Sequence, residues 1–181
     1  MAVALNFAAF QLGWFACVLG AAYGAAWAGT AAAMAIVAWH IARAERPRAE
    51  ILLALISAAI GAVWDSALAL VGWISYPGGA LLEGTAPHWI VALWMLFATT
   101  LNLSLAWLKR SVALAAAFGA VGGPLAYWAG ERLGALTLAE PTAALVALSA
   151  GWAVLTPLLL QLAVRFDGFR PRAIFTSATH A

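Results

Sequence analysis

Six long apolar runs alternate with short polar connections along the 181-residue chain. A helix that crosses a bilayer needs about 20 predominantly apolar residues, because each residue rises about 1.5 Å. The pattern therefore predicts an all-α fold: an integral membrane bundle over residues 1–164, followed by a polar cytoplasmic tail over residues 165–181. The six predicted transmembrane helices cover residues 4–23, 26–42, 51–74, 88–108, 111–128 and 142–164.

The basic residues lie almost entirely in connections on one side of this predicted bundle. Only Arg132 falls on the opposite side, where Glu83, Glu131 and Glu140 also lie. Loops rich in Lys and Arg stay in the cytoplasm, so the bias predicts that both termini are cytoplasmic and favours a bacterial inner membrane. The eight residues on the basic side are Arg43, Arg46, Arg48, Lys109, Arg110, Arg165, Arg170 and Arg172.

Composition supports insertion in a membrane and excludes several classes of protein. Hydrophobic residues make up 66% of the chain and charged residues 9%, with a mean hydropathy of +0.96. The basic residues border the membrane and form no continuous face, which argues against nucleic-acid binding. The single cysteine, Cys17, excludes an intramolecular disulfide. No HExxH, P-loop, GxSxG or CxxC motif is present, and the three histidines are far apart, so we expect neither a metal nor a cofactor.

One carboxylate, Asp65, lies inside the third apolar run. An acidic side chain at the centre of a membrane helix costs roughly 2.5–3.5 kcal/mol on insertion scales, so such residues usually face a cavity. About 15 residues separate Asp65 from the start of its run, which places it roughly 22 Å into the membrane, in the outer half. A carboxylate shielded from water can act as an acid or a base. The alternative is a packing role, with neighbouring Ser, Tyr or Trp side chains as hydrogen-bond partners.

Other polar and aromatic residues are expected near Asp65 or at the outer rim above it. We expect a pocket that opens to the outer leaflet, with Asp65 at its floor and Tyr76, Glu83 and His88 at its mouth. The predicted catalytic residues are Asp65, Tyr76, His88 and Tyr127, and the predicted substrate-binding residues are Trp64, Trp89, Trp94 and Asn102.

The fifth run is rich in small residues, including Gly119, Gly122 and Gly123, which allow helices to approach closely. Pro124 is predicted to kink this helix and to free the carbonyl near Ala120. That carbonyl either packs against a neighbouring helix or lines a polar cavity.

A second set of polar residues lies nearer the cytoplasm. Asn6, Gln11, Asn102 and Ser104 have similar predicted depths, and hydrogen bonds between helices account for them without chemistry. His40 lies at the end of the second run, where a cation suits the helix dipole, and Glu50 suits the first turn of the third.

Four stretches resemble an uncharacterised proteobacterial family of small multi-pass inner-membrane proteins, a domain of unknown function. They are NFAAFQLGWFACVLGAA, WDSALALVGWISYPGG, APHWIVALWMLFATTLNLSLAWL and GAVGGPLAYWAGERLGAL, and the resemblance covers about residues 5–160. Genes of this family tend to lie near fatty-acid-modifying methyltransferases of the cyclopropane-synthase type, which implies a link to lipid metabolism. The polar and aromatic marks that the resemblance implies are Asn6, Gln11, Trp14, Asp65, Tyr76, Pro77, Trp89, Trp94, Asn102, Pro124 and Tyr127.

The chain departs from the family pattern at Leu103, where a polar residue, often His, is expected. This departure weakens any site built around that position. A shorter pattern, an acid within a span followed by an aromatic-Pro turn, is similar to that of membrane-embedded lycopene cyclases and lysoplasmalogenases. So short a likeness does not establish function.

Three hypotheses for function remain open at this level. The first is a membrane-embedded protein that acts on or binds a lipid or isoprenoid in a pocket around Asp65. The second is a small transporter that uses Asp65 for coupling or binding. The third is a non-catalytic accessory subunit of a membrane lipid-modifying complex. The expected partners are membrane lipids and, in the third case, another membrane protein.

Overall fold

The computed structural model describes residues 2–169, and within them the chain is all-helical, as predicted. Two short strands pair antiparallel, with Ile74 opposite Leu138. The helices are α1 (Ala2–Ala22), α2 (Ala26–Ala42), α3 (Pro47–Leu70), α4 (His88–Leu101), α5 (Val112–Arg132) and α6 (Pro141–Arg165), with a 3₁₀ helix η1 (Ala106–Arg110) and strands β1 (Ile74–Ser75) and β2 (Thr137–Leu138).

Four of the helices, α1, α3, α5 and α6, are long and apolar enough to cross a membrane. The 17 residues of α2 and the 14 residues of α4 are also apolar but shorter. A 14-residue helix is about 21 Å long, less than the roughly 30 Å of a hydrocarbon core.

The predicted fourth span, residues 88–108, is wrong in its last third as a continuous helix, because α4 ends at Leu101. The carbonyl of Thr100 accepts hydrogen bonds from the amides of Leu103 and Leu105, so the backbone turns before it continues as η1. The side chain of Asn102, the first residue after the helix, donates to the Glu50 carboxylate at 2.7 Å. Hydropathy does not report hydrogen bonds to other segments of the chain, so it could not indicate where this helix ends.

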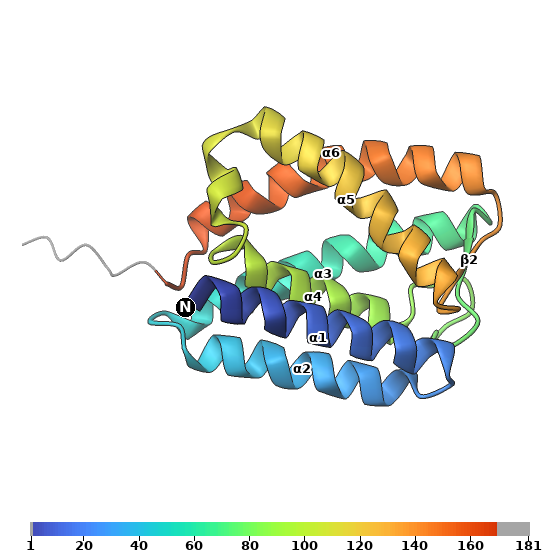
Figure 1. The fold of residues 1–181 in the computed structure, drawn as a ribbon, viewed down its shortest axis with the longest axis horizontal. Coiled ribbons are helices and arrows are strands. Elements are labelled where there is room, and N and C mark those ends of the chain that lie inside the picture. Colours follow the sequence, from blue (N-terminus) through green and yellow to red (C-terminus); the bar gives the residue numbers. More distant parts are fainter. Residues whose placement is uncertain (1, 170–181) are drawn as a thin grey trace, which may run out of the picture.

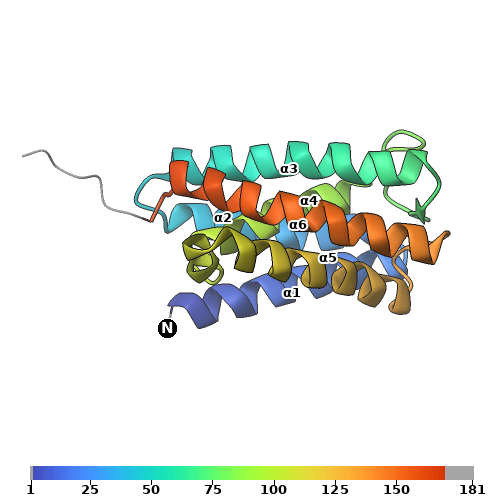
Figure 2. The ribbon, with the colours of Figure 1, turned by 90° about the horizontal axis from the view of Figure 1, so that it is seen from above.

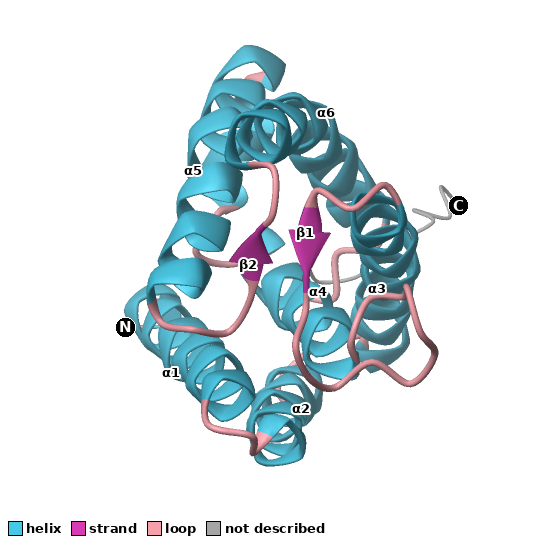
Figure 3. Ribbon diagram, turned by 90° about the vertical axis from the view of Figure 1, so that its right-hand side faces the viewer, coloured by secondary structure: helices cyan, strands magenta, loops and turns pink. Residues whose placement is uncertain are grey.

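The short helix α4 lies at the centre of the bundle (Figure 3). It packs against α1, α2, α3 and α6, and most of its residues are buried. The pairs α1–α2 and α5–α6 form hairpins, and α3 and α1 lie at opposite margins of the bundle (Figure 2). The burial of α4 on all sides explains its uniformly apolar sequence.

Tryptophan rings pack directly onto glycines of neighbouring helices. A Cβ added to Gly61 would lie 2.0 Å from the ring of Trp94, and one added to Gly123 would lie 2.2 Å from the ring of Trp152. Each of these glycines leaves the space that an indole ring fills. The predicted close approach of the fifth helix to a neighbour is confirmed at Gly119, where an added Cβ would lie 2.2 Å from the backbone carbonyl oxygen of Trp152.

The carbonyl predicted to be freed by Pro124 is that of Ala120, and it accepts a hydrogen bond from Ser149 Oγ of α6 at 2.9 Å. Of the two interpretations of this carbonyl, helix packing is therefore correct. Ser149 replaces the hydrogen bond that a proline removes from the helix.

The two ends of the bundle differ in charge. The basic end contains the α2–α3 connection, η1 and the C-terminal end of α6, and the loop end contains β1 and β2 (Figure 1). Backbone hydrogen bonds tie the residues after α6 to the basic end, since Arg46 N donates to Gly168 O at 3.0 Å. Arg43, Arg46, Arg48, Lys109, Arg110 and Arg165 lie at the basic end, whereas Arg170 and Arg172 lie outside the described residues.

Candidate functional site

Asp65 lies in α3 with no exposed surface, and both of its carboxylate oxygens accept hydrogen bonds. Oδ1 accepts from the hydroxyl of Tyr76 at 2.7 Å and from that of Tyr127 at 2.6 Å. Oδ2 accepts from Trp94 Nε1 at 2.7 Å. These four residues, here called the Asp65 cluster, come from α3, the connection after β1, α4 and α5. The structure thus brings together three of the predicted catalytic residues and one predicted substrate contact.

The local sequence explains how Trp94 reaches Asp65. Gly61 precedes Asp65 by one helical turn, so the face of α3 beneath the carboxylate carries no side chain there. The indole of Trp94 occupies this space and directs Nε1 at the carboxylate. A larger residue at position 61 would displace the ring.

Tyr76 is held by the connection between α3 and α4. Its ring meets the ring of Trp89 edge-on, with centroids 5.9 Å apart, and Trp89 Nε1 donates to Gly78 O at 3.2 Å. The pairing of β1 with β2 anchors the start of this connection to the α5–α6 connection. Burial, together with the nearby Asp65 carboxylate, raises the pKa of Tyr76 well above its usual value, which keeps its hydroxyl a donor.

Three donors and no cation surround the Asp65 carboxylate within the described part of the chain. A carboxylate in an apolar interior is unfavourable unless it is paired or hydrogen-bonded. Hydrogen bonds to a charged acceptor contribute about 1.5–3 kcal/mol each, which is enough to retain the group. The cluster is therefore a complete polar network, in agreement with its burial.

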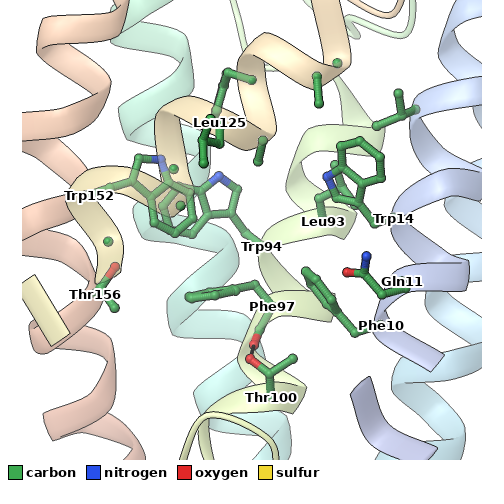
Figure 4. A pocket seen from close by; sticks show the side chains of 18 of the residues that line it. Phe10, Gln11, Trp14, Leu93, Trp94, Phe97, Thr100, Leu125, Trp152 and Thr156 are labelled. Atoms are coloured by element: carbon green, nitrogen blue, oxygen red, sulfur yellow. Dashed lines mark hydrogen bonds between the residues drawn. The ribbon is translucent and has the colours of Figure 1, made fainter. Parts of the chain in front are cut away.

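A cavity of about 500 Å³ lies beside the Asp65 cluster, between α1, α4, α5 and α6 (Figure 4). Trp89, Trp94 and Tyr127 line it, whereas Asp65 itself does not. Asp65 is therefore separated from the cavity by its own hydrogen-bond donors, and is not the floor that the sequence predicts. The Tyr127 hydroxyl and the Trp94 indole connect the carboxylate to the cavity wall.

Nine of the 25 residues that line the cavity are aromatic, and they supply its largest side chains. The rings of Trp94 and Trp152 stack with centroids 4.6 Å apart, and Phe97 meets Trp152 edge-on at 5.3 Å (Figure 4). The rings that complete the wall are those of Phe7, Phe10, Trp14, Trp89, Phe118 and Tyr127. Such a wall suits an apolar molecule with few hydrogen-bonding groups.

The cavity opens to the side of the bundle, between α1 and α5. The helix α1 packs on α2 and α4, whereas α5 packs on α6, so the two helices flank the cavity without forming a hairpin. Phe7, Phe118 and Leu125 line the cavity and are also exposed at the outer surface, Leu125 by 55%. A chain that lay against this face could enter from the side.

His88 lies outside the Asp65 cluster. Its Nδ1 forms a hydrogen bond with Thr30 Oγ1 of α2 at 2.7 Å, and its ring stacks on that of Trp27 at 3.8 Å between centroids. His88 therefore joins the start of α4 to α2. Glu83 is exposed in the connection before it.

Two predicted substrate contacts, Trp64 and Asn102, also point elsewhere. The ring of Trp64 packs on Gly151 of α6, and its buried Nε1 has no partner among the described residues. Asn102 lies at the basic end, where it donates to Glu50 Oε1 and accepts from Lys109 Nζ at 2.5 Å.

A second buried polar cluster, at the basic end, was missed by sequence reasoning. His40 Nε2 lies 2.9 Å from Glu50 Oε2, and the amide of Gly168 donates to Glu50 Oε1 at 2.8 Å. Sequence reasoning treats His40 and Glu50 separately, each as a charge that suits the dipole of its own helix. The signal that could have joined them is their position: each lies one turn inside one of two antiparallel helices that a short connection links.

The chain matches one family of known proteins. Residues 3–158 match the model of the family described as protein of unknown function DUF2878, so the chain belongs to that family. The membership confirms the resemblance to a domain of unknown function. Neither curated proteins nor solved structures give a match.

Proposed function

We propose that this member of the DUF2878 family binds the chain of a lipid, of acyl or isoprenoid type, in the cavity between α1 and α5. The observation that carries the proposal is that an aromatic-lined cavity of about 500 Å³ shares Trp94 and Tyr127 with a buried carboxylate network. Sites for small molecules have this size and this mixture of apolar wall and few polar groups. The lateral opening suits a ligand that comes from the bilayer.

We further propose that all six helices lie in a bacterial inner membrane, with both termini in the cytoplasm. The basic end supports this orientation, since Arg132 is the one arginine or lysine of the described residues at the loop end. The length of α1, α3, α5 and α6 supports insertion directly. We place α4 in the membrane because the surrounding helices bury it, and α2 because it is apolar, packs on α1 and α4, and exposes large apolar side chains such as Trp27 and Met34.

Tyr127 is the member of the cluster through which Asp65 would act on a bound chain. It lines the cavity and donates to Asp65 Oδ1 at 2.6 Å. If the protein modifies its ligand, the proton passes between ligand and Asp65 through this hydroxyl. Tyr76, on the other side of Oδ1, supplies the second hydrogen bond that orients the carboxylate.

One observation favours a second candidate function, a non-catalytic accessory subunit of a lipid-modifying complex. Both Asp65 oxygens are already satisfied by protein donors, which is also the arrangement of a purely structural carboxylate. In that case the cavity presents the lipid to a partner membrane protein.

Photo-crosslinking with a diazirine-bearing acyl lipid tests the proposed binding. Gly122 lines the cavity, and a Cβ there would meet only Phe118, at 3.8 Å, so Gly122→Phe places a ring in the cavity without a clash at its Cβ. We expect labelling of α1 and α5 peptides in the wild type and at least a fivefold loss in Gly122→Phe. Val121→Phe, on the exposed side of the same helix, is the matched control and should label normally. Equal labelling of Gly122→Phe and the wild type would place lipid elsewhere.

A lipid profile separates the two candidate functions. Cells that lack the gene are complemented with the wild type or with Asp65→Asn, and their lipids are compared by mass spectrometry. Catalysis through Tyr127 predicts that Asp65→Asn inserts normally and fails to restore the profile. Full restoration by Asp65→Asn supports the accessory function instead.

A further inference from the structure

The wall of the cavity contains no charged side chain. Asp65, the nearest carboxylate, is screened by Trp94 and Tyr127. A phosphate, carboxylate or ammonium group inside this cavity would be desolvated without a partner, which is strongly unfavourable. The part of the ligand that enters must therefore be uncharged.

Three polar side chains of the wall are nevertheless left without partners within residues 2–169, and two of them lie away from the Asp65 cluster. Thr156 of α6 is fully buried, and its Oγ1 forms no hydrogen bond with the described residues. The carboxamide of Gln11 on α1 faces the cavity and likewise forms none within residues 2–169. Figure 4 shows the two side chains on opposite sides of the aromatic floor formed by Phe10 and Phe97.

The other hydroxyl groups of the wall are satisfied within the protein. Thr100 Oγ1 donates to Phe97 O at 2.6 Å, and Ser104 Oγ donates to Asn6 Oδ1 at 2.7 Å. The buried Nε1 of Trp152 also has no partner within residues 2–169, but it lies on the same edge of the stacked pair as Trp94 Nε1, which faces the Asp65 cluster (Figure 4). Gln11 and Thr156 are therefore the unpartnered groups on the side of the cavity away from that cluster.

Both groups lie deep along their helices. Gln11 is near the middle of the 21-residue α1, and Thr156 is at a similar distance from the same end of the bundle, about 13 Å from the basic end in each case. A charged headgroup stays at the interface, far from this depth. What meets Gln11 and Thr156 is therefore the middle of a chain.

We propose that the cavity takes the middle of a lipid chain that bears an uncharged oxygen group, such as a hydroxyl or a carbonyl, hydrogen-bonded by Thr156 or, on the opposite side of the aromatic floor, by Gln11. This inference rests on the proposed function and names the ligand class of the same site. A plain hydrocarbon would leave the fully buried Thr156 hydroxyl unpaired and would cover the half-buried Gln11 carboxamide without bonding to it, which is unfavourable. The charged headgroup of such a lipid remains outside the cavity, because the wall offers no oppositely charged partner.

The volume fits one chain and no larger occupant. A water-sized group, similar to a methylene, occupies about 30 Å³, so the cavity of about 500 Å³ holds roughly 17 of them. A helix is about 10 Å across. A helix of a partner or of a second copy would therefore fill this volume with little more than one turn.

Competition against the photoactivatable lipid tests this inference on the full chain. The probes are two neutral esters that differ in one mid-chain oxygen, methyl 12-hydroxyoctadecanoate and methyl octadecanoate. One hydrogen bond contributes about 0.5–1.5 kcal/mol net, so the hydroxylated ester should compete at a concentration about three- to tenfold lower.

The double variant Gln11→Leu/Thr156→Val should lose this preference while the plain ester competes as before. Thr100→Val removes a lining hydroxyl that the protein already satisfies, and should keep the preference. Equal competition by both esters on the wild type, or a preference that survives in the double variant, overturns the ligand class and leaves lipid binding intact. If neither ester competes and crosslinks join α1 and α5 of two copies, the proposed function itself fails.

Discussion

Asp65 receives three hydrogen bonds from residues 11, 29 and 62 positions away, so it joins four segments of the chain at one point. At the scale of single residues, each donor has a separate geometric origin. Trp94 depends on the missing side chain of Gly61, Tyr76 on the ring of Trp89, and Tyr127 on α5. Removal of one donor should lower the stability of the bundle, while the other two hydrogen bonds to Asp65 remain.

Tyr127→Phe tests this expectation. The variant removes the 2.6 Å hydrogen bond and keeps the ring that lines the cavity. A lost hydrogen bond to a buried carboxylate costs about 1.5–3 kcal/mol, so we expect the Tm in detergent to fall by several degrees. Tyr23→Phe, at a hydroxyl whose residue is 83% exposed, should leave the Tm unchanged. Equal Tm values for the two variants would contradict a stabilising role of the cluster.

Depth along a helix could be predicted from the sequence, whereas rotation about the helix axis could not. The rise per residue puts Asp65, Trp94 and Tyr127 at one level, and the structure joins them. The directions of His88 and Asn102 depend on how α4 is turned and where it ends. Because α4 is apolar on every side, its sequence contains no periodic signal for either.

At the scale of helices, glycines decide where indole rings can lie. α3 and α4 meet at Gly61, and α5 and α6 meet at Gly123 and Gly119, so the same device supports both sides of the cavity. The sequence indicated this for the fifth run, where glycines are grouped. It gave no comparable sign for Gly61, which is isolated among larger apolar residues.

Gly61→Ala should disrupt the Asp65 cluster from a distance. The added methyl would lie 2.0 Å from the Trp94 ring, so the ring must move and its bond to Asp65 Oδ2 must lengthen. We expect a loss of Tm larger than that of Tyr127→Phe and a changed near-ultraviolet circular dichroism of tryptophan. Gly78→Ala, with nothing within 4 Å of its Cβ and no positive φ, is the matched control. An unchanged tryptophan spectrum in Gly61→Ala would argue against the packing described.

At the scale of the whole molecule, the cavity arises because two helical hairpins do not close on each other. α1–α2 and α5–α6 both pack against other helices of the bundle, and α5 crosses obliquely (Figure 1). The number of helices could be predicted from hydropathy, but this crossing could not, since it depends on side-chain shapes in the interfaces. Sequence reasoning predicts Asp65 at the floor of the cavity. In the structure Trp94 and Tyr127 line the cavity, and Asp65 lies behind them.

The proposed orientation makes a prediction for accessibility. The variant Glu83→Cys places a thiol in the connection between β1 and α4. This thiol should react with a membrane-impermeant maleimide from the periplasmic side. The thiol of the variant Arg43→Cys should react only after the membrane is permeabilised. The native Cys17 is fully buried and should give little background. The reverse pattern would invert the orientation of the bundle.

The central claim is that the cavity holds a lipid chain, and native mass spectrometry of the purified protein tests it most directly. We expect the wild type and Val121→Phe to retain a lipid adduct, whereas Gly122→Phe loses it. An adduct retained equally by Gly122→Phe and the wild type would contradict the claim, because the phenylalanine ring would take up a large part of the volume that the chain needs.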